Sequence, residues 1–287
     1  MCPACVATVA WWIAGTGSSG GLLALVAKRR RKNPGRAERT MNAPNVVTRN
    51  EWLEERTRLL KREKELTRLH DDVARQRRAL PCVEVEKDYV FEGPRGRARL
   101  ADLFAGRSQL VLYHFMFGPD WAEGCPSCSF AADHFDGPIV HLNQRDVSFA
   151  AVARAPFAKL AKFKERMGWR FDLFSSSGSD FNFDYRVSFT PEQMATGAVE
   201  YNYAKAPFPA EEAPGLSVFR RDADGRLFHT YSSYGRGCEL LLMTYAILDL
   251  VPKGRGEEGL DFTMSWVRHH DRYGGAPSIS RASASLP

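Results

Sequence analysis

The spacing of apolar residues after Pro81 predicts alternating strands and helices. Residues 82–93, "CVEVEKDYVFEG", alternate like a strand, whereas "SQLVLYHFMF" (108–117) is a near-continuous apolar run. A run of that kind is typical of a central strand covered on both faces. Residues 156–168 begin with proline, space their apolar side chains like a helix and end in glycine, as helices often do.

Further patterns complete a layered α/β domain over residues 81–275. Residues 126–145 are compatible with a helix, "VSFAAVAR" and "WRFDLF" resemble strands, residues 216–234 contain two strands around an Asp-Gly turn, and "CELLLMTYAILDL" is helical. This order of strands and helices predicts a central sheet with a parallel middle and an antiparallel edge. Residues 182–215 show no clear period and are expected to form an insertion.

A charged segment before this domain predicts a long amphipathic helix. Residues 33–48 carry proline and glycine like a linker, and residues 50–80 follow, with Asn50 as the expected N-cap. Apolar side chains recur every seven residues at Trp52, Leu59, Leu66, Val73 and Leu80. Such a stripe favours packing against the domain or a partner, or self-association as a coiled coil. A solvated charged face is the plainer alternative.

Residues 1–32 combine an uncharged stretch, 6–27, with the basic flank "KRRRK". About 20 apolar residues can span a bilayer, and the basic flank would stay on its cytoplasmic side. The "GTGSSGG" centre weakens this interpretation. A membrane anchor, a disordered tail, and an untranslated extension before a start at Met41 therefore all stay open. The last residues, 276–287, are expected to be disordered.

Charge and cysteine content narrow the class of protein. The net charge of +6 arises in residues 28–78, which hold 17 basic and 8 acidic side chains, so the rest is slightly acidic and shows no nucleic-acid footprint. Six cysteines are too few for a disulfide scaffold. Without an export signal they indicate a reducing compartment such as the cytoplasm, where a close pair is catalytic or metal-binding. The pair Cys2 and Cys5 has no predicted fold around it and receives no role.

The "CPSC" sequence at Cys125 and Cys128 follows the predicted buried strand and opens a helix, with Pro126 in its first turn. A thiol at a helix start faces unpaired N–H groups and the positive end of the helix dipole, and both favour the thiolate. Cys128 lies one turn further on, where we expect it to be the more buried sulfur and able to close a disulfide with Cys125.

Two other interpretations of the pair stay open. A metal site needs at least two more ligands, and His114, His134 and His141 are the candidates, although the domain has no second Cys-x-x-Cys. The cysteines could also be inert, because cysteine is readily buried as a small apolar side chain. His114 itself is expected to be a satisfied core histidine.

The strand, the "CPSC" and the later "APGLSVFRRDADG" together resemble the thioredoxin fold, which implies a three-layer α/β sandwich around a mixed sheet. Thioredoxin-like proteins carry a cis-proline just before the strand that flanks the active site. By this resemblance Pro214 faces the cysteine pair, and its neighbouring backbone pairs with a substrate chain. The proline after Cys125 is similar to the glutaredoxins.

A more specific resemblance covers about residues 45 to 275. The segments "EKELTR", "KDYVFEGP", "YHFMFGPDW", "RAPFAKLAKFKERMGWRF", "SSSGSDFNFDY", "HTYSSYGRG" and "WVRHHDRY" appear in an order similar to a bacterial family of thioredoxin-like proteins known as domain of unknown function 899. That resemblance supports the fold and implies no particular substrate.

The sequence also departs from better-known relatives. Thioredoxins usually place tryptophan directly before the first cysteine, where this chain has Gly124, with Trp121 four positions ahead of Cys125. A peroxiredoxin would need proline and threonine or serine where this chain has Gly118 and Ala122. The segments "SSSGSDFN" and "WVRHHDRY" could line a pocket or serve as a loop and a C-terminal cap.

The sequence therefore favours a thiol–disulfide oxidoreductase. Cys125 attacks, Cys128 resolves, and Trp121, Pro126 and Pro214 position the substrate, which is a protein or small-molecule disulfide or thiol. No metal, cofactor or nucleic acid is expected in this function. The alternatives are a thioredoxin-like interaction module without turnover, which would use the insertion and the charged helix, and a metal-binding regulator. An anchor at residues 6–27 would attach the protein to the cytoplasmic face of the membrane.

Overall fold

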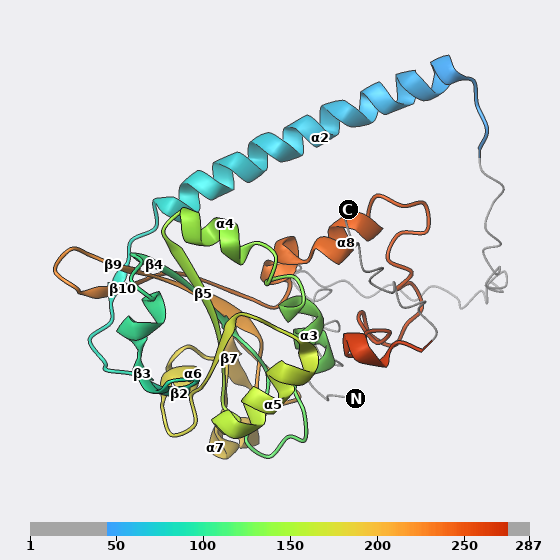
Figure 1. Ribbon diagram of the computed structural model, residues 1–287. Helices are drawn as coiled ribbons and strands as arrows, with labels where there is room; N and C mark the ends of the chain where they lie inside the picture. The colour runs from blue at the N-terminus through green and yellow to red at the C-terminus, as the bar shows by residue number, and fades with distance from the viewer. Residues whose placement is uncertain (1–44, 275–287) are drawn as a thin grey trace, which may run out of the picture. The chain divides into compact units, whose positions relative to one another are not determined.

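The computed structural model describes residues 45–274 (Figure 1). These residues fall into two units, 45–80 and 81–274, which are described separately. The stretch 6–27, the first cysteine pair and the tail at 276–287 lie outside the described residues. Within the described range, no helix combines the length and apolar character needed to cross a membrane.

The charged segment forms a single helix, α2 (Arg49–Arg78). Its N-cap is Thr48: the Thr48 hydroxyl accepts from the Glu51 N–H, and the Glu51 carboxylate accepts from the Thr48 N–H at 2.8 Å. The prediction of Asn50 as the cap is therefore wrong, because this reciprocal capping box starts the helix two residues earlier. The helix contains no buried residue, and self-association through its apolar stripe stays a prediction.

Residues 81–274 are built on an eight-stranded sheet with the strand order β1-β10-β9-β4-β5-β6-β2-β3 (Figure 1). The strands are β1 (Val83–Glu84), β2 (Val90–Gly93), β3 (Gly96–Arg99), β4 (Gln109–His114), β5 (Val147–Ala153), β6 (Asp172–Ser175), β9 (Gly215–Arg221) and β10 (Leu227–Tyr234). Strands β4, β5 and β6 run parallel, whereas β9 lies antiparallel to both β4 and β10. The predicted parallel middle and antiparallel edge are confirmed.

Helices cover both faces of this sheet. One apolar core involves α3 (Pro126–Ala132), α5 (Phe157–Met167) and α8 (Met243–Leu248), and the other involves the 3-10 helix η1 (Leu100–Phe104) and α6 (Phe181–Asp184). Neighbouring residues of β4 face opposite sides, so Tyr113 belongs to the first core and Leu112 to the second. The chain order β4, α3, β5, α5, then the β9–β10 hairpin and α8, is that of the thioredoxin fold. The predicted three-layer α/β class is confirmed.

Three segments break up more than their patterns predict. Residues 82–93 give two strands in different places, because β1 pairs with β10 and β2 pairs with β3 and β6. Residues 126–145 divide into α3 and α4 (Ile139–Gln144). The segment predicted as a helix at 238–250 begins as the 3-10 helix η2 (Gly235–Leu241) and continues as α8. A last short 3-10 helix, η3, spans His270–Arg272.

The insertion at 182–215 carries small elements of its own. They are α7 (Pro191–Ala195) and a two-stranded sheet of β7 (Val199–Tyr201) and β8 (Ala204–Ala206). A separate apolar cluster holds them together around the buried side chains of Phe189, Val199 and Ala213. The insertion is therefore a compact addition that ends directly at β9.

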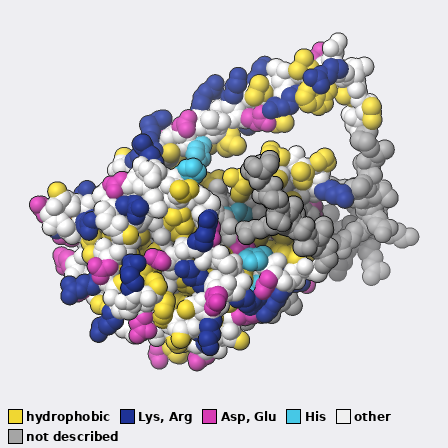
Figure 2. Space-filling model, in the orientation of Figure 1, with side chains coloured by type: hydrophobic (Ala, Val, Ile, Leu, Met, Phe, Trp, Pro, Cys, Tyr) yellow, Lys and Arg dark blue, Asp and Glu magenta, His cyan; other side chains and the backbone are white. Residues whose placement is uncertain are grey.

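Charges are mixed on the face of the domain that Figure 2 shows. Basic and acidic side chains are interspersed there over the strands and helices of residues 81–274.

Candidate functional site

The loop after β4 brings Cys125 to the start of α3. Cys125 is the N-cap residue of α3, and Pro126 takes the first helical position. The Cys125 N–H donates to the Met116 carbonyl at 3.0 Å. The Cys125 carbonyl accepts from the Ser129 N–H and from the Ser129 hydroxyl, both at 2.9 Å. These bonds fix the backbone of the first cysteine between the strand and the helix.

Both cysteine side chains are buried, with Cys125 1% exposed and Cys128 3% exposed. The prediction that Cys128 is the deeper of the two is wrong. The loop between the strand and the helix folds Phe115 and Phe117 into the same apolar core as the cysteines. The Cys125 side chain at the start of α3 is therefore covered instead of lying at the surface.

A cavity of about 420 Å³ adjoins the pair. Cys125, Cys128 and Pro214 all line it, and so does Cys238 from η2. Around them the lining is largely apolar, with contributions from Met116, Ala131, Phe135, Leu216, Leu241, Leu242 and Met264. The structure thus brings the two predicted sulfurs and the predicted proline to one space of the size that small ligands occupy.

Tyr113 adds a phenol to this cavity. Its hydroxyl donates to the Cys128 carbonyl at 3.4 Å. Burial first, and then the neighbouring Cys128, raise the pKa of Tyr113 well above its ordinary value. The phenol therefore keeps its proton at neutral pH and can act only as a neutral hydrogen-bond partner of the site.

Pro214 differs from the thioredoxin pattern in two ways. The described residues contain no cis peptide bond, so the proline is trans and the implied cis geometry is wrong for this chain. The backbone beside it is also already bonded within the protein. The Ala213 N–H donates to the Val187 carbonyl at 2.9 Å, and the Pro214 carbonyl accepts from the Tyr201 hydroxyl at 2.7 Å. The resemblance implies that the backbone beside Pro214 pairs with a substrate chain. In this structure these backbone groups are bonded to residues of the insertion instead.

Trp121 and Pro126 are absent from the lining of the cavity. The half-buried Trp121 ring packs against the core around the cysteines, and its Nε1–H donates to Glu211 at 3.1 Å. Lys159 donates to the Trp121 carbonyl at 2.9 Å. Trp121 therefore holds the loop before Cys125 against the segment before Pro214, and Pro126 starts the helix.

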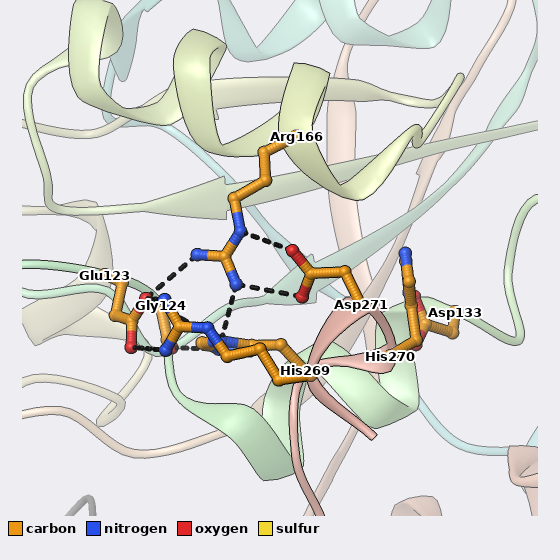
Figure 3. A network of polar contacts seen from close by, with 8 residues as sticks. Glu123, Gly124, Asp133, Arg166, His269, His270 and Asp271 are labelled. Atoms are coloured by element: carbon orange, nitrogen blue, oxygen red, sulfur yellow. Dashed lines mark hydrogen bonds and ion pairs between the residues drawn. The ribbon is translucent and has the colours of Figure 1, made fainter. Parts of the chain in front are cut away.

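The segment "WVRHHDRY" closes over the loop before Cys125, as Figure 3 shows. His269, which is 1% exposed, bonds through Nε2 to the Gly124 carbonyl at 2.9 Å and through Nδ1 to Arg166 at 3.1 Å. Because a guanidinium only donates, Nδ1 accepts and Nε2 carries the proton. Arg166 also pairs with Asp271 and Glu123 at 2.8 to 2.9 Å. The sequence left open whether this segment lines a pocket or forms a C-terminal cap. These contacts are those of a cap.

Gly124 stands where thioredoxins have tryptophan because two aromatic rings fill the space. A Cβ atom on Gly124 would lie 2.4 Å from Phe115 Cζ and 3.0 Å from Phe163 Cε1. Both rings are buried in the core and cannot move freely. A larger residue directly before Cys125 is thereby excluded.

Gly124→Ala is expected to destabilise the protein by about 2 kcal/mol, because overpacking a filled core forces rings off their preferred positions. Urea unfolding followed by circular dichroism measures the change. The matched control is Gly137→Ala, since an added Cβ there meets no atom within 4 Å. Equal stability of the two variants would contradict this account of Gly124.

His114 is buried in the core as expected, but the expectation that it is fully satisfied is wrong, because its buried Nδ1 has no hydrogen-bond partner among the described residues. It is 1% exposed, its Nε2 bonds to the Ser217 hydroxyl at 2.8 Å and its ring stacks on Phe181. Burial, with a smaller effect of His229, lowers its pKa to about 3. Within residues 45–274, no three histidine, cysteine or acidic side chains are grouped to hold a metal.

Sequence reasoning missed Cys238, Tyr113 and Tyr201 as neighbours of the pair. Burial raises the pKa of the Cys238 thiol to about 11, so it stays protonated at neutral pH, and it donates to the Ser233 carbonyl at 3.3 Å. The alternation along β4 could have placed Tyr113 on the α3 side of the sheet. Cys238 lies more than a hundred residues from the pair, and the sequence carries no signal of that contact.

Comparison with known families identifies the chain. A model described as "Bacterial protein of unknown function (DUF899)" matches residues 41–273. The chain belongs to this family. The match to the DUF899 model therefore includes the charged helix as well as the thioredoxin-like domain. No curated protein matches this DUF899 member.

Solved structures similar to this DUF899 protein include several peroxiredoxins. The peroxidoxin BcpB of Mycobacterium tuberculosis is 18% identical, with 57% of this chain and 95% of the other covered and a TM-score of 0.38. A peroxiredoxin Q mutant of Xanthomonas campestris is 13% identical, with 58% and 98% covered and a TM-score of 0.40. A cysteine-to-serine mutant of the peroxiredoxin 6 of Arenicola marina is 14% identical, with 59% and 74% covered and a TM-score of 0.38.

Proposed function

We propose that this protein is a thiol–disulfide oxidoreductase whose redox pair is Cys125 and Cys128. The observation that carries the proposal is the shared cavity: both cysteines and Pro214 line one space of about 420 Å³. Pairs of cysteines three residues apart at a helix start are suited to closing and opening a disulfide. The thioredoxin-like fold supports the same chemistry, since it places such a pair after the central strand.

The reaction needs two steps. The Cys125 thiolate attacks one sulfur of a substrate disulfide, which forms a mixed disulfide and releases the first substrate thiol. Cys128 then attacks the Cys125 sulfur, closes the intramolecular disulfide and releases the second thiol. The protons of the two protein thiols end on the two substrate thiols, and two electrons pass to the substrate. A dithiol reductant returns the pair to its starting state.

The surroundings have separate tasks in this proposal. Tyr113, which stays a neutral phenol, lies beside Cys128 and offers a hydrogen bond while that sulfur is charged. The Met116 carbonyl and the cap made by His269 hold the backbone at Cys125. Trp121, Pro126 and Pro214 position these parts and do not react. We place this chemistry in a reducing compartment, with any membrane attachment depending on residues 6–27, outside the described range.

The experiment that tests this function traps the intermediate. Reduced Cys128→Ser protein is mixed with an excess of a small model disulfide and examined by intact-mass spectrometry. Without the resolving thiol, the mixed disulfide on Cys125 is expected to persist, whereas the wild-type chain passes on to its internal disulfide and loses the adduct. Peptide mapping then locates the adduct.

The control is Cys125→Ser, which keeps Cys128 and lacks the attacking sulfur. It is expected to carry no adduct at Cys128 on the same timescale. An adduct found only at Cys82 or Cys238, or equal labelling of both variants, would overturn the assignment of Cys125 as the nucleophile.

A further inference from the structure

The edge of the fold that would receive a substrate chain is occupied by the protein's own insertion. The Val187 carbonyl accepts from the Ala213 N–H at 2.9 Å, and the Glu211 carbonyl accepts from the Phe189 N–H at 2.9 Å. Ser188 and Glu212 form an antiparallel bridge between these two bonds. A peptide that adds to a sheet edge needs those same donors and acceptors. Backbone pairing with a substrate chain at this place is therefore blocked.

The Pro214 carbonyl, the next group that could bond to a substrate chain, is already bonded to a tyrosine. The Tyr201 hydroxyl donates to the Pro214 carbonyl at 2.7 Å and accepts from the Gly235 N–H at 2.9 Å. Burial raises the pKa of Tyr201 well above its ordinary value, so this donor persists at neutral pH. The bond joins the insertion to the start of η2, which forms another part of the cavity lining. The approach to the cysteines is thus through the cavity.

Three of the four charged residues that line the cavity bind one another, and the fourth, Glu257, is bonded to neutral groups. Arg255 pairs with Glu239 and with Asp249, and Arg236 pairs with Glu239 at 2.8 Å. Glu257 Oε1 accepts from the Tyr245 hydroxyl at 2.8 Å, the Met264 N–H at 2.9 Å and the Trp266 Nε1–H at 2.7 Å. An anionic substrate would have to break one of these pairs in order to bind Arg236 or Arg255, and it would also meet the Glu257 carboxylate. The cost of leaving a partner unpaired disfavours anionic ligands here, and the largely apolar lining favours uncharged ones.

From these observations we infer that the substrate is a small, uncharged, apolar disulfide that enters the 420 Å³ cavity, in place of a protein disulfide. This inference rests on the proposed function and specifies its substrate class. The apolar side chains that line the cavity bury the carbon chains of the ligand, and the disulfide lies against Cys125. The reaction is the two-step reduction given above, which releases two apolar thiols.

Two disulfides of matched length test the substrate class. Dibutyl disulfide has uncharged ends, whereas dithiodibutyrate carries a carboxylate in place of each terminal methyl group. With the full chain and a dithiol reductant, kcat/KM for dibutyl disulfide is expected to exceed that for dithiodibutyrate and for insulin by about tenfold or more, the size of preference that an apolar pocket provides.

A blocking variant tests the cavity itself. Thr263 lines the cavity and is exposed, so Thr263→Trp can narrow the cavity without entering the core. It is expected to lower kcat/KM for dibutyl disulfide by about tenfold. The matched control is Asp261→Trp, at an exposed position of the same loop and absent from the lining, which is expected to stay within about twofold of the wild type.

The outcomes separate this inference from the proposed function. Faster reduction of dithiodibutyrate or insulin would overturn the inference and leave the oxidoreductase function standing. If none of the three disulfides is reduced, the proposed function fails, and calorimetry decides the ligand class. In that case, binding of dibutyl disulfide to a Cys125→Ser, Cys128→Ser double variant, lost with Thr263→Trp, would retain the ligand class. No binding would overturn it.

Discussion

Cys125→Ser is expected to lower the rate of disulfide reduction by about a thousandfold or more, because a hydroxyl group cannot replace a thiolate as the attacking group. The structure indicates that this variant changes the reactive group without disturbing the fold. The Cys125 backbone is fixed by Met116 and Ser129, so the exchange of one buried atom should leave the helix start in place. The measurement is turnover of a model disulfide with a dithiol reductant, together with the melting temperature of each variant.

The matched control for this loss is Cys82→Ser. Cys82 is exposed, precedes β1 and does not line the cavity. Its replacement is expected to leave turnover within about twofold of the wild type. Retained turnover in Cys125→Ser, with an intact fold, would overturn the assignment of Cys125 as the nucleophile. Absence of turnover in the wild type would instead favour a thioredoxin-like module that binds without turnover.

Arg154→Met is expected to destabilise the domain by about 1 kcal/mol more at pH 8 than at pH 5, because a group with a pKa of about 7 gains about 1.4 kcal/mol from ionising one pH unit above that value. Arg154 bonds to Glu212 at 2.8 Å, and Glu212 is 1% exposed and also accepts from the Ser188 hydroxyl at 2.6 Å. Burial raises the pKa of Glu212, whereas the bonds to Ser188 and Arg154 lower it. The effect of burial is the larger, so the pKa is about 7 instead of the ordinary 4.5. Removing Arg154 takes away the cation that favours the carboxylate, so the pKa rises further.

The sign of the pH effect follows from that raised pKa. Between pH 4.5 and 7 the folded protein keeps a proton on Glu212 that the unfolded chain has lost, so wild-type stability falls as the pH rises through this window. Below it, the carboxyl is neutral in both states and Arg154 contributes little. Above pH 7, Glu212 is a buried carboxylate, and the ion pair with Arg154 stabilises the folded protein. Urea unfolding at pH 5 and pH 8 measures both quantities.

The control is Arg154→Met in a Glu212→Gln background. Glutamine cannot ionise, so the arginine should then contribute the same free energy at both pH values. A loss in the single variant that is equal at pH 5 and pH 8 would show that Arg154 acts through packing on Phe183, which its guanidinium contacts at 4.6 Å, and not through the buried carboxyl group.

The fold was accessible from the sequence because its signals are local. The apolar run at 108–117 became the central strand β4, and the proline and glycine around α5 mark that helix as expected. The position of Cys125 at a helix start needed only the adjacent strand and Pro126. Errors arose where two local signals compete. Thr48 replaced Asn50 as the N-cap because the Thr48–Glu51 pair satisfies more backbone donors.

The surroundings of the pair depended on contacts between distant parts of the chain. Cys238 reaches the cavity from η2, His269 reaches Gly124 across 145 residues, and Tyr201 occupies the carbonyl of Pro214. No periodicity encodes such contacts, because each results from how separate elements pack. The depth of Cys125 is a further example, since it depends on Phe115 and Phe117 folding inward.

The sequence by itself determined the central strands β4, β5 and β6, the helix α5 and the place of the cysteine pair, since periodicity and capping act over a few neighbouring residues. Only the tertiary structure decided which groups surround that pair and which edge the insertion covers. Hydrogen bonds and apolar contacts between remote segments form only after the chain has packed, and they set the chemistry that the cavity can admit.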